Sequence, residues 1–192
     1  MKNLQITAYT QHFIRQQVMP GDICIDATMG NGNDTALLSQ LAGKRGRVLA
    51  FDIQKQALEH TEERLKRDNC PENYQLLLES HENMDVYAEA ETVSCITFNL
   101  GYLPGGDHSV ATRADSSKRA VESGLKLLKK GGLMTLCIYS YCLHNFTSSP
   151  TVLGTPHQSA PAVSPVHQLQ IWLFGFCGEK ISCQGSPRRC HR

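Results

Sequence analysis

The stretch Ile23-Cys24-Ile25-Asp26-Ala27-Thr28-Met29-Gly30-Asn31-Gly32-Asn33-Asp34-Thr35 decides the fold expected for this chain. Its apolar start predicts a short buried strand over 23–28. Gly30 and Gly32 then predict a sharp turn in which the backbone approaches a ligand closely. Apolar residues at helical spacing follow, so we expect a helix over 34–41 with Asp34 as its N-terminal cap.

Outward from this stretch, strand and helix signals alternate through the first 140 residues. Strands are expected at 23–28, 48–53, 74–78, 93–100 and 133–140, and helices at 4–18, 34–41, 55–69, 82–88 and 116–130. Strands that are apolar throughout, each followed by a helix, indicate a parallel sheet covered on both faces. The expected fold class is therefore α/β, with a doubly wound, Rossmann-like and mostly parallel sheet. Ligands of such sheets bind at the carboxyl ends of the strands.

An acidic residue, Asp52, ends the second expected strand about twenty residues after the glycine turn, where a carboxylate accepts both hydroxyls of a ribose. The alternative is a tight turn with a purely structural Asp52. A dinucleotide is disfavoured because its fingerprint needs glycine at position 35, which is Thr35. Asp26 and Asp34 also place carboxylates near the position that the pyrophosphate of a dinucleotide would occupy. They suit a cationic ligand better, such as the sulfonium and amino groups of S-adenosylmethionine.

Polar residues follow the third and fourth expected strands as well. Ser80-His81-Glu82 comes after the third, where His81 or Glu82 is expected to touch a cofactor unless the segment is a solvated loop. The fourth ends in Asn99-Leu100-Gly101-Tyr102-Leu103-Pro104-Gly105-Gly106-Asp107-His108. This segment is similar to the Asn/Asp-Pro-Pro-Tyr loop of amine-methylating enzymes, in which an Asn carbonyl faces the amine. Asp107 or His108 would accept a proton. The alternative is a Gly-Pro turn with surface polar residues.

Taken together, these motifs resemble class I methyltransferases. Residues 4–140 resemble a small bacterial family that was first labelled rRNA methylases and is now understood as tRNA 5-aminomethyluridine methyltransferases. The resemblance implies methyl transfer from S-adenosylmethionine to the amine of a modified wobble uridine in tRNA. It implies Asn99, Asp107 and His108 as catalytic residues. The cofactor-binding residues that it implies are Asp26, Thr28, Gly30, Asn31, Gly32, Asn33, Asp34, Thr35, Asp52, Gln54, His81, Glu82 and Asn99.

The composition changes abruptly after residue 140. Residues 141–192 hold four of the eight Cys, four of the eight His and five of the eight Pro, but one of the eighteen acidic residues. We therefore divide the chain into a methyltransferase domain, 1–140, and an atypical, poorly ordered tail, 141–192. The C-terminal helix and strands of the family are expected to be missing or replaced. One strand is expected over 170–177 and no element after Gly178. The hypothesis is a frameshift or altered splicing that leaves activity weak or absent, and the alternative is a divergent C-terminal lobe.

Composition also limits the partners and the compartment. The net charge of +1 over 192 residues argues neither for nor against nucleic acid, so tRNA rests on the resemblance alone. No apolar run approaches the roughly 18 residues of a membrane span, and Cys-x₂-Cys pairs are absent, so neither membrane nor metal is expected. A cytoplasmic location is expected, and a homodimer stays open. The rival functions are a nicotinamide-dependent dehydrogenase, a cofactor-binding pseudoenzyme, and a methyltransferase acting on rRNA or a small amine.

Overall fold

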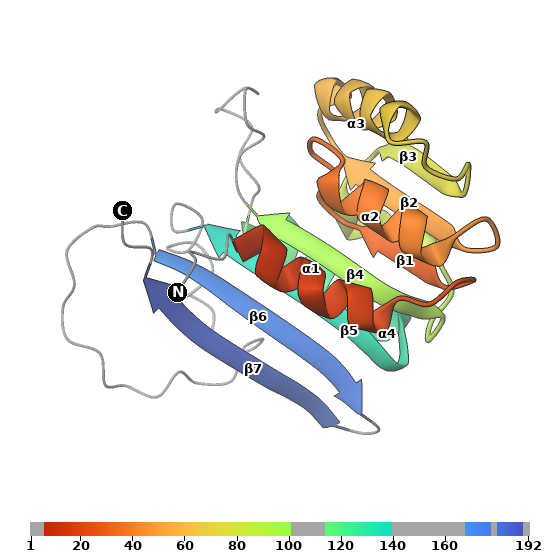
Figure 1. The fold of residues 1–192 in the computed structure, drawn as a ribbon. Coiled ribbons are helices and arrows are strands. Elements are labelled where there is room, and N and C mark those ends of the chain that lie inside the picture. The colour runs from red at the N-terminus through yellow and green to blue at the C-terminus, as the bar shows by residue number, and fades with distance from the viewer. Residues whose placement is uncertain (1–5, 101–113, 140–167, 178–179, 190–192) are drawn as a thin grey trace.

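The computed structural model describes residues 6–100, 114–139, 168–177 and 180–189 of the chain. Strands and helices alternate along it, as Figure 1 shows. The helical elements are α1 (Ile6–Gln17), α2 (Asn33–Ala42), α3 (Lys55–Arg67), the 3₁₀ helix η1 (His81–Val86) and α4 (Ala114–Leu127). The strands are β1 (Ile23–Asp26), β2 (Arg47–Asp52), β3 (Tyr74–Leu78), β4 (Val93–Leu100), β5 (Leu128–Tyr139), β6 (Gln168–Cys177) and β7 (Lys180–Arg189).

All of these strands form one sheet in the order β3-β2-β1-β4-β5-β6-β7. Strands β1 to β5 pair in parallel. Strand β6 pairs antiparallel with β5, and β7 pairs antiparallel with β6. The chain winds from β1 outward to β3, returns to the other side of β1 as β4, and continues outward. The strand order therefore reverses between β1 and β4, which is where such sheets bind ligands. The expected doubly wound α/β fold is confirmed.

Helices cover both faces of the sheet. On one face, Ile14 of α1, Val18 directly after this helix, and Leu37 and Leu38 of α2 pack against the strands. The opposite face is covered by α4, through residues such as Val121, and by Met84 of η1. Figure 1 shows α1 and α2 side by side on the same face. Because β1, β2 and β4 are covered on both faces, their apolar residues other than Ile23 are buried, which accounts for their continuous hydrophobic pattern.

Two expectations about helix ends are corrected. The N-cap of α2 is Gly32, in a left-handed conformation and without a side-chain cap bond, rather than Asp34. The carboxylate of Asp34 instead binds side-chain amides of other elements. Helix α4 ends at Leu127 rather than at 130, because Leu128 already pairs with Val93 of β4. The register then shifts before Leu133, around a glycine turn in which Gly131 has φ of 79°.

The tail contains more strand than expected. β6 confirms the strand predicted over 170–177, whereas β7 corrects the expectation of no element after Gly178. Main-chain pairing with β6 along the whole of β7 explains this strand, since its sequence has no strand-like alternation. Pro187 is compatible with it because β7 is an edge strand, where a missing N–H is tolerated. The division at residue 140 remains a prediction.

Candidate functional site

The predicted residues gather at the carboxyl ends of β1, β2 and β4, on both sides of the reversal in strand order. The segment after β1 is held between the neighbouring strands by main-chain hydrogen bonds. Ala27 N–H donates to the Thr97 carbonyl of β4 at 2.9 Å, and Met29 N–H donates to the Phe51 carbonyl of β2 at 2.9 Å. The glycine loop therefore starts from a fixed position in the centre of this edge.

The glycine loop needs both of its glycines. Gly30 and Gly32 have φ of 52° and 73°, which is the left-handed region that side chains other than glycine rarely adopt. Space is also lacking at position 32: a Cβ there would lie 2.8 Å from Oγ1 and 3.0 Å from Cα of Thr61. Helix α3 therefore packs directly against the loop, and an alanine at position 32 is disfavoured both by the backbone conformation and by the contact with Thr61.

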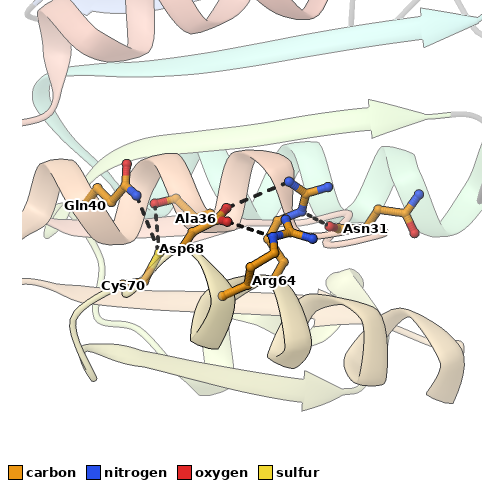
Figure 2. A network of polar contacts seen from close by, with 7 residues as sticks. Asn31, Ala36, Gln40, Arg64, Asp68 and Cys70 are labelled. Atoms are coloured by element: carbon orange, nitrogen blue, oxygen red, sulfur yellow. Dashed lines mark hydrogen bonds and ion pairs between the residues drawn. The ribbon is translucent and has the colours of Figure 1, made fainter.

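Polar side chains of α3 hold the loop in this conformation. Thr61 Oγ1 donates to the Gly30 carbonyl at 3.1 Å, and Arg64 Nε donates to the Asn31 carbonyl at 2.6 Å. His60 Nδ1 lies 3.0 Å from Asn31 Oδ1. Figure 2 shows Arg64 reaching from α3 to Asn31, and Asp68 at the end of α3 lies within 3.9 Å of the same guanidinium. The periodicity of α3 predicted its buried face, but did not reveal these contacts.

The network in Figure 2 extends further along the contact between α2 and α3. Cys70 Sγ donates to the Ala36 carbonyl, and Gln40 Nε2 donates to Cys70 Sγ, each at 3.8 Å. Burial raises the pKa of the Cys70 thiol, so it stays protonated and keeps its role as a donor. These contacts join α2 to the segment that follows α3.

Asp52 is bound to the loop and to its own strand end. Its Oδ2 accepts the Gly30 N–H at 3.0 Å, and its Oδ1 accepts the Gln54 N–H at 2.9 Å. Both oxygens have further lone pairs, and the residue is partly exposed. Such a carboxylate is fixed in place and still able to accept hydroxyl donors. Gln54 contributes through its backbone N–H.

Asp26 is a buried carboxyl group, 1% exposed. Its Oδ2 accepts the Thr35 hydroxyl at 2.6 Å, and its Oδ1 accepts the Thr28 N–H at 3.2 Å. Burial, together with the negative charge of Asp34, raises the pKa of Asp26 to about 7. A cation close to this group would favour its ionised form.

Asn99 and Asp34 bring β4 and α2 together. The Asn99 amide, through Nδ2, donates to Asp34 Oδ2 at 2.9 Å. Gln11 of α1 donates through Nε2 to the other oxygen, Oδ1, at 2.9 Å. The Asn99 main-chain N–H donates to Thr28 Oγ1 at 2.7 Å. Sequence reasoning did not identify Gln11, because nothing in the pattern of α1 distinguishes it from a solvated glutamine.

The ring of His81 has a buried nitrogen without a hydrogen-bond partner among the described residues. A carbonyl oxygen only accepts, so Nδ1, which lies 3.0 Å from the Ala27 carbonyl, carries the proton. The buried Nε2 is then an acceptor, and it has no partner among the described residues. Burial lowers the pKa of His81, which keeps the ring neutral. The ring edge also contacts Phe98, with 5.9 Å between the centroids.

Other predicted residues lie apart from this cluster. Glu82 is paired with Arg119 of α4, whose Nε donates to it at 2.8 Å, and this bond lowers the pKa of Glu82. The side chain of Asn33 is exposed. Asp107 and His108 lie outside the described residues. Two exposed apolar residues adjoin this region: Ile53 directly follows Asp52 in the chain, and Leu78 is the register partner of Asp52 on the neighbouring strand β3.

Two further properties concern the described parts of the chain. Among these residues, no three His, Cys, Asp or Glu side chains lie close enough together to hold a metal ion. The helices there are too short or too polar to cross a membrane.

Comparison with known proteins shows which family the chain resembles. A family model described as "Putative rRNA methylase" matches residues 48–144, so the match ends close to the change in composition. A chloroplastic tRNA (mnm(5)s(2)U34)-methyltransferase of Arabidopsis thaliana is 38% identical over 141 residues, which are 67% of this chain and 50% of the relative. The chain thus spans about half the length of this curated relative.

Solved structures match over a larger share. A protein of Clostridium thermocellum described as a "putative rRNA-methylase" is 36% identical with a TM-score of 0.70, covering 82% of this chain and 86% of its own. A "putative methyltransferase" of Streptococcus mutans, solved in complex with S-adenosylhomocysteine (SAH), is 30% identical with a TM-score of 0.69. That match covers 89% of this chain and 97% of the streptococcal one.

Proposed function

Because the chain belongs to the family described as "Putative rRNA methylase", which consists of class I S-adenosylmethionine-dependent methyltransferases, we propose that it methylates a primary amine in RNA. The substrate we propose is the aminomethyl group of a modified wobble uridine in tRNA. The name of the Arabidopsis relative supports tRNA, and the description of the family keeps rRNA as the second candidate.

The residues at the strand ends fit S-adenosylmethionine. Asp52 would accept the ribose hydroxyls, since it is fixed by two backbone N–H groups and has free lone pairs. The backbone of Gly30 to Gly32 approaches closely without side chains, as the methionine part requires. Asp26 would face the positive charges of that part. The buried acceptor of His81 lacks a protein partner among the described residues, and a cofactor N–H or O–H would satisfy it.

The other cofactor-binding residues of the proposal act mainly by shaping this surface. Thr28 and Thr35 hold Asn99 and Asp26, and Asn31 is held by α3. Glu82, tied to Arg119, and the exposed Asn33 are proposed to border the cofactor. Ile53 and Leu78 provide an apolar surface beside Asp52 for the adenine ring.

One observation carries the proposed chemistry: Asn99 lies at the carboxyl end of β4, where its main-chain N–H donates to Thr28 of the segment that follows β1 and its side-chain amide donates to Asp34. A bound S-adenosylmethionine supplies an activated methyl group on a sulfonium. The Asn99 carbonyl oxygen would accept an N–H of the neutral amine and turn its lone pair toward that methyl group. Positive charge then develops on the nitrogen, and the carbonyl dipole stabilises it. Asp107 or His108 is proposed to remove the extra proton.

The test uses tRNA from cells that lack the final N-methylation, together with rRNA and a small primary amine as parallel substrates. We expect nucleoside mass spectrometry to show one added methyl group on the tRNA wobble uridine, and transfer to be much slower, but still measurable, in Asn99→Ala. Methylation of rRNA alone would exclude tRNA as the substrate. SAH binding without transfer to any of these substrates would overturn the proposed activity and favour a pseudoenzyme.

A further inference from the structure

Asp34 is a buried carboxylate whose partners are two neutral amides. It lies in the first turn of α2 and is 6% exposed. Gln11 donates to one oxygen and Asn99 to the other, each at 2.9 Å. None of the ion pairs within the described parts of the chain involves Asp34. Burial of a carboxylate costs free energy unless its oxygens accept hydrogen bonds. The two amides therefore stabilise Asp34 in its buried position.

The contact with Asp34 fixes the orientation of the Asn99 amide. A carboxylate only accepts hydrogen bonds, so the amide nitrogen of Asn99 must face it. The carbonyl oxygen Oδ1 lies on the other arm of the planar amide and is directed away from Asp34. The main chain of Asn99 is fixed as well, because its N–H donates to Thr28 Oγ1. Both the place of Asn99 and the direction of its carbonyl are therefore set before substrate binds.

We propose that Asp34 is a positioning residue, which holds Asn99 with its carbonyl oxygen toward the substrate amine. The inference rests on the proposed function, since it names how that site is organised. With the amide reversed, Asn99 would present N–H groups to an amine that itself needs an acceptor. The negative charge of Asp34 also polarises the amide, which strengthens the carbonyl as an acceptor while positive charge develops on the amine nitrogen.

This role differs from direct contact with the cofactor, and two substitutions separate them. Asp34→Leu removes both acceptors at similar volume and frees the Asn99 amide to rotate. We expect kcat to fall about tenfold to hundredfold, as for a hydrogen bond to a charged group, with the Kd of SAH within about twofold of wild type. Asp34→Asn is the conservative variant. It keeps one acceptor for Asn99 if Gln11 reverses its own amide, so we expect it to retain kcat within about threefold of wild type.

A double-substitution cycle locates the effect on Asn99. In an Asn99→Ala background, Asp34→Leu should lower kcat no further, because the group through which it acts is already absent. An equal loss of kcat with and without Asn99 would overturn the proposal. So would a rise in the Kd of SAH that matches the loss of kcat, since this would make Asp34 a ligand of the cofactor.

A measurement without substrate covers the case in which Asp34→Leu does not fold. In ¹⁵N-labelled protein, the side-chain NH₂ signal of Asn99 is assigned by its absence in Asn99→Ala. We expect one of its protons to be shifted downfield by the carboxylate, and this shift to decrease in Asp34→Asn. An unchanged signal would overturn the proposal. Absence of methyl transfer by the wild-type protein would instead refute the proposed function, while the NMR and SAH measurements still decide the contact between Asp34 and Asn99.

Discussion

Asp52 at the end of β2 accepts the backbone N–H of Gly30 at 3.0 Å, so the proposed ribose acceptor and the glycine loop form one hydrogen-bonded unit. The second oxygen of Asp52 accepts the Gln54 N–H at 2.9 Å. These bonds orient the carboxylate without consuming all of its lone pairs. Any change of this group is therefore expected to affect the loop and the ligand together.

Asp52→Asn keeps the size of the side chain but replaces one accepting oxygen by a donor. One backbone N–H then loses its partner, and a ribose hydroxyl loses its charged acceptor. We expect the Kd of SAH, measured by calorimetry, to rise about tenfold to hundredfold. Glu59→Gln is the control, because Glu59 is an exposed residue of α3 that pairs with Lys55 at 3.6 Å. Equal Kd values for the two variants would contradict the role of Asp52.

Gly32→Ala tests the close contact between the glycine loop and α3. The variant introduces a left-handed alanine and a Cβ that would lie 2.8 Å from Thr61 Oγ1. Gly131→Ala is the matched control, since Gly131 has φ of 79° and nothing within 4 Å of its Cβ position. We expect the control to lose about 1–2 kcal/mol of unfolding free energy. Gly32→Ala should lose roughly 1–3 kcal/mol more, because of the steric conflict.

Urea unfolding with linear extrapolation measures this difference. Thr61→Ala should return part of the loss in the Gly32→Ala background, because it removes Oγ1 and Cγ2 but leaves the Thr61 Cα in place. Equal losses for Gly32→Ala and Gly131→Ala would show that α3 yields readily, and that the glycine at position 32 is required by its backbone conformation alone.

Arg64→Met tests whether α3 orders the loop for binding. Arg64 Nε donates to the Asn31 carbonyl at 2.6 Å, and methionine keeps much of the apolar stem while removing this bond. We expect the Kd of SAH to rise about threefold to tenfold, the value of one hydrogen bond. Arg67→Met is the control on the same helix, since Arg67 pairs with Asp68 at the surface. An equal effect of both variants would indicate a general effect of charge.

The sequence predicted the parts of this site that depend on local pattern. Apolar strands, the glycine turn, Asp52 and Asn99 are all visible in short stretches of the chain. It did not predict Gln11 or Arg64, because their contacts depend on how separate helices pack against the sheet. The same reason explains the error at Asp34: a local pattern favours a helix cap, whereas the folded chain offers amides from α1 and β4.

The pairing of β7 shows the same limit for main-chain interactions. Its residues have no alternation that predicts a strand, yet they pair with β6 from Lys180 to Arg189. Main-chain hydrogen bonds are available to almost any sequence next to an unpaired strand edge. A sequence pattern indicates which side chains are buried. It therefore does not predict a strand that is formed mainly by main-chain hydrogen bonds.

Asp26 predicts a pH dependence of stability. Its pKa is about 7 in the folded chain, owing to burial and to Asp34, against about 3.9 for an unfolded aspartate. Between these values the folded state binds more protons than the unfolded state. The contribution of Asp26 to the unfolding free energy therefore decreases as pH rises from about 4 to about 7, by at most about 1.4 kcal/mol per pH unit. Above that range it is constant.

Asp26→Asn removes this titration while keeping the shape of the side chain. The Thr35 hydroxyl both donates and accepts, so it pairs with either end of the new amide, and the Thr28 N–H keeps an acceptor. Groups that do not interact with Asp26, such as Asp22, titrate in the same way in both proteins and cancel in the comparison. We expect the difference in unfolding free energy, Asp26→Asn minus wild type, to increase between pH 4 and 7 and to stay constant above pH 8. A difference independent of pH would mean that Asp26 is ionised throughout, and that Thr28 and Thr35 offset the cost of its burial.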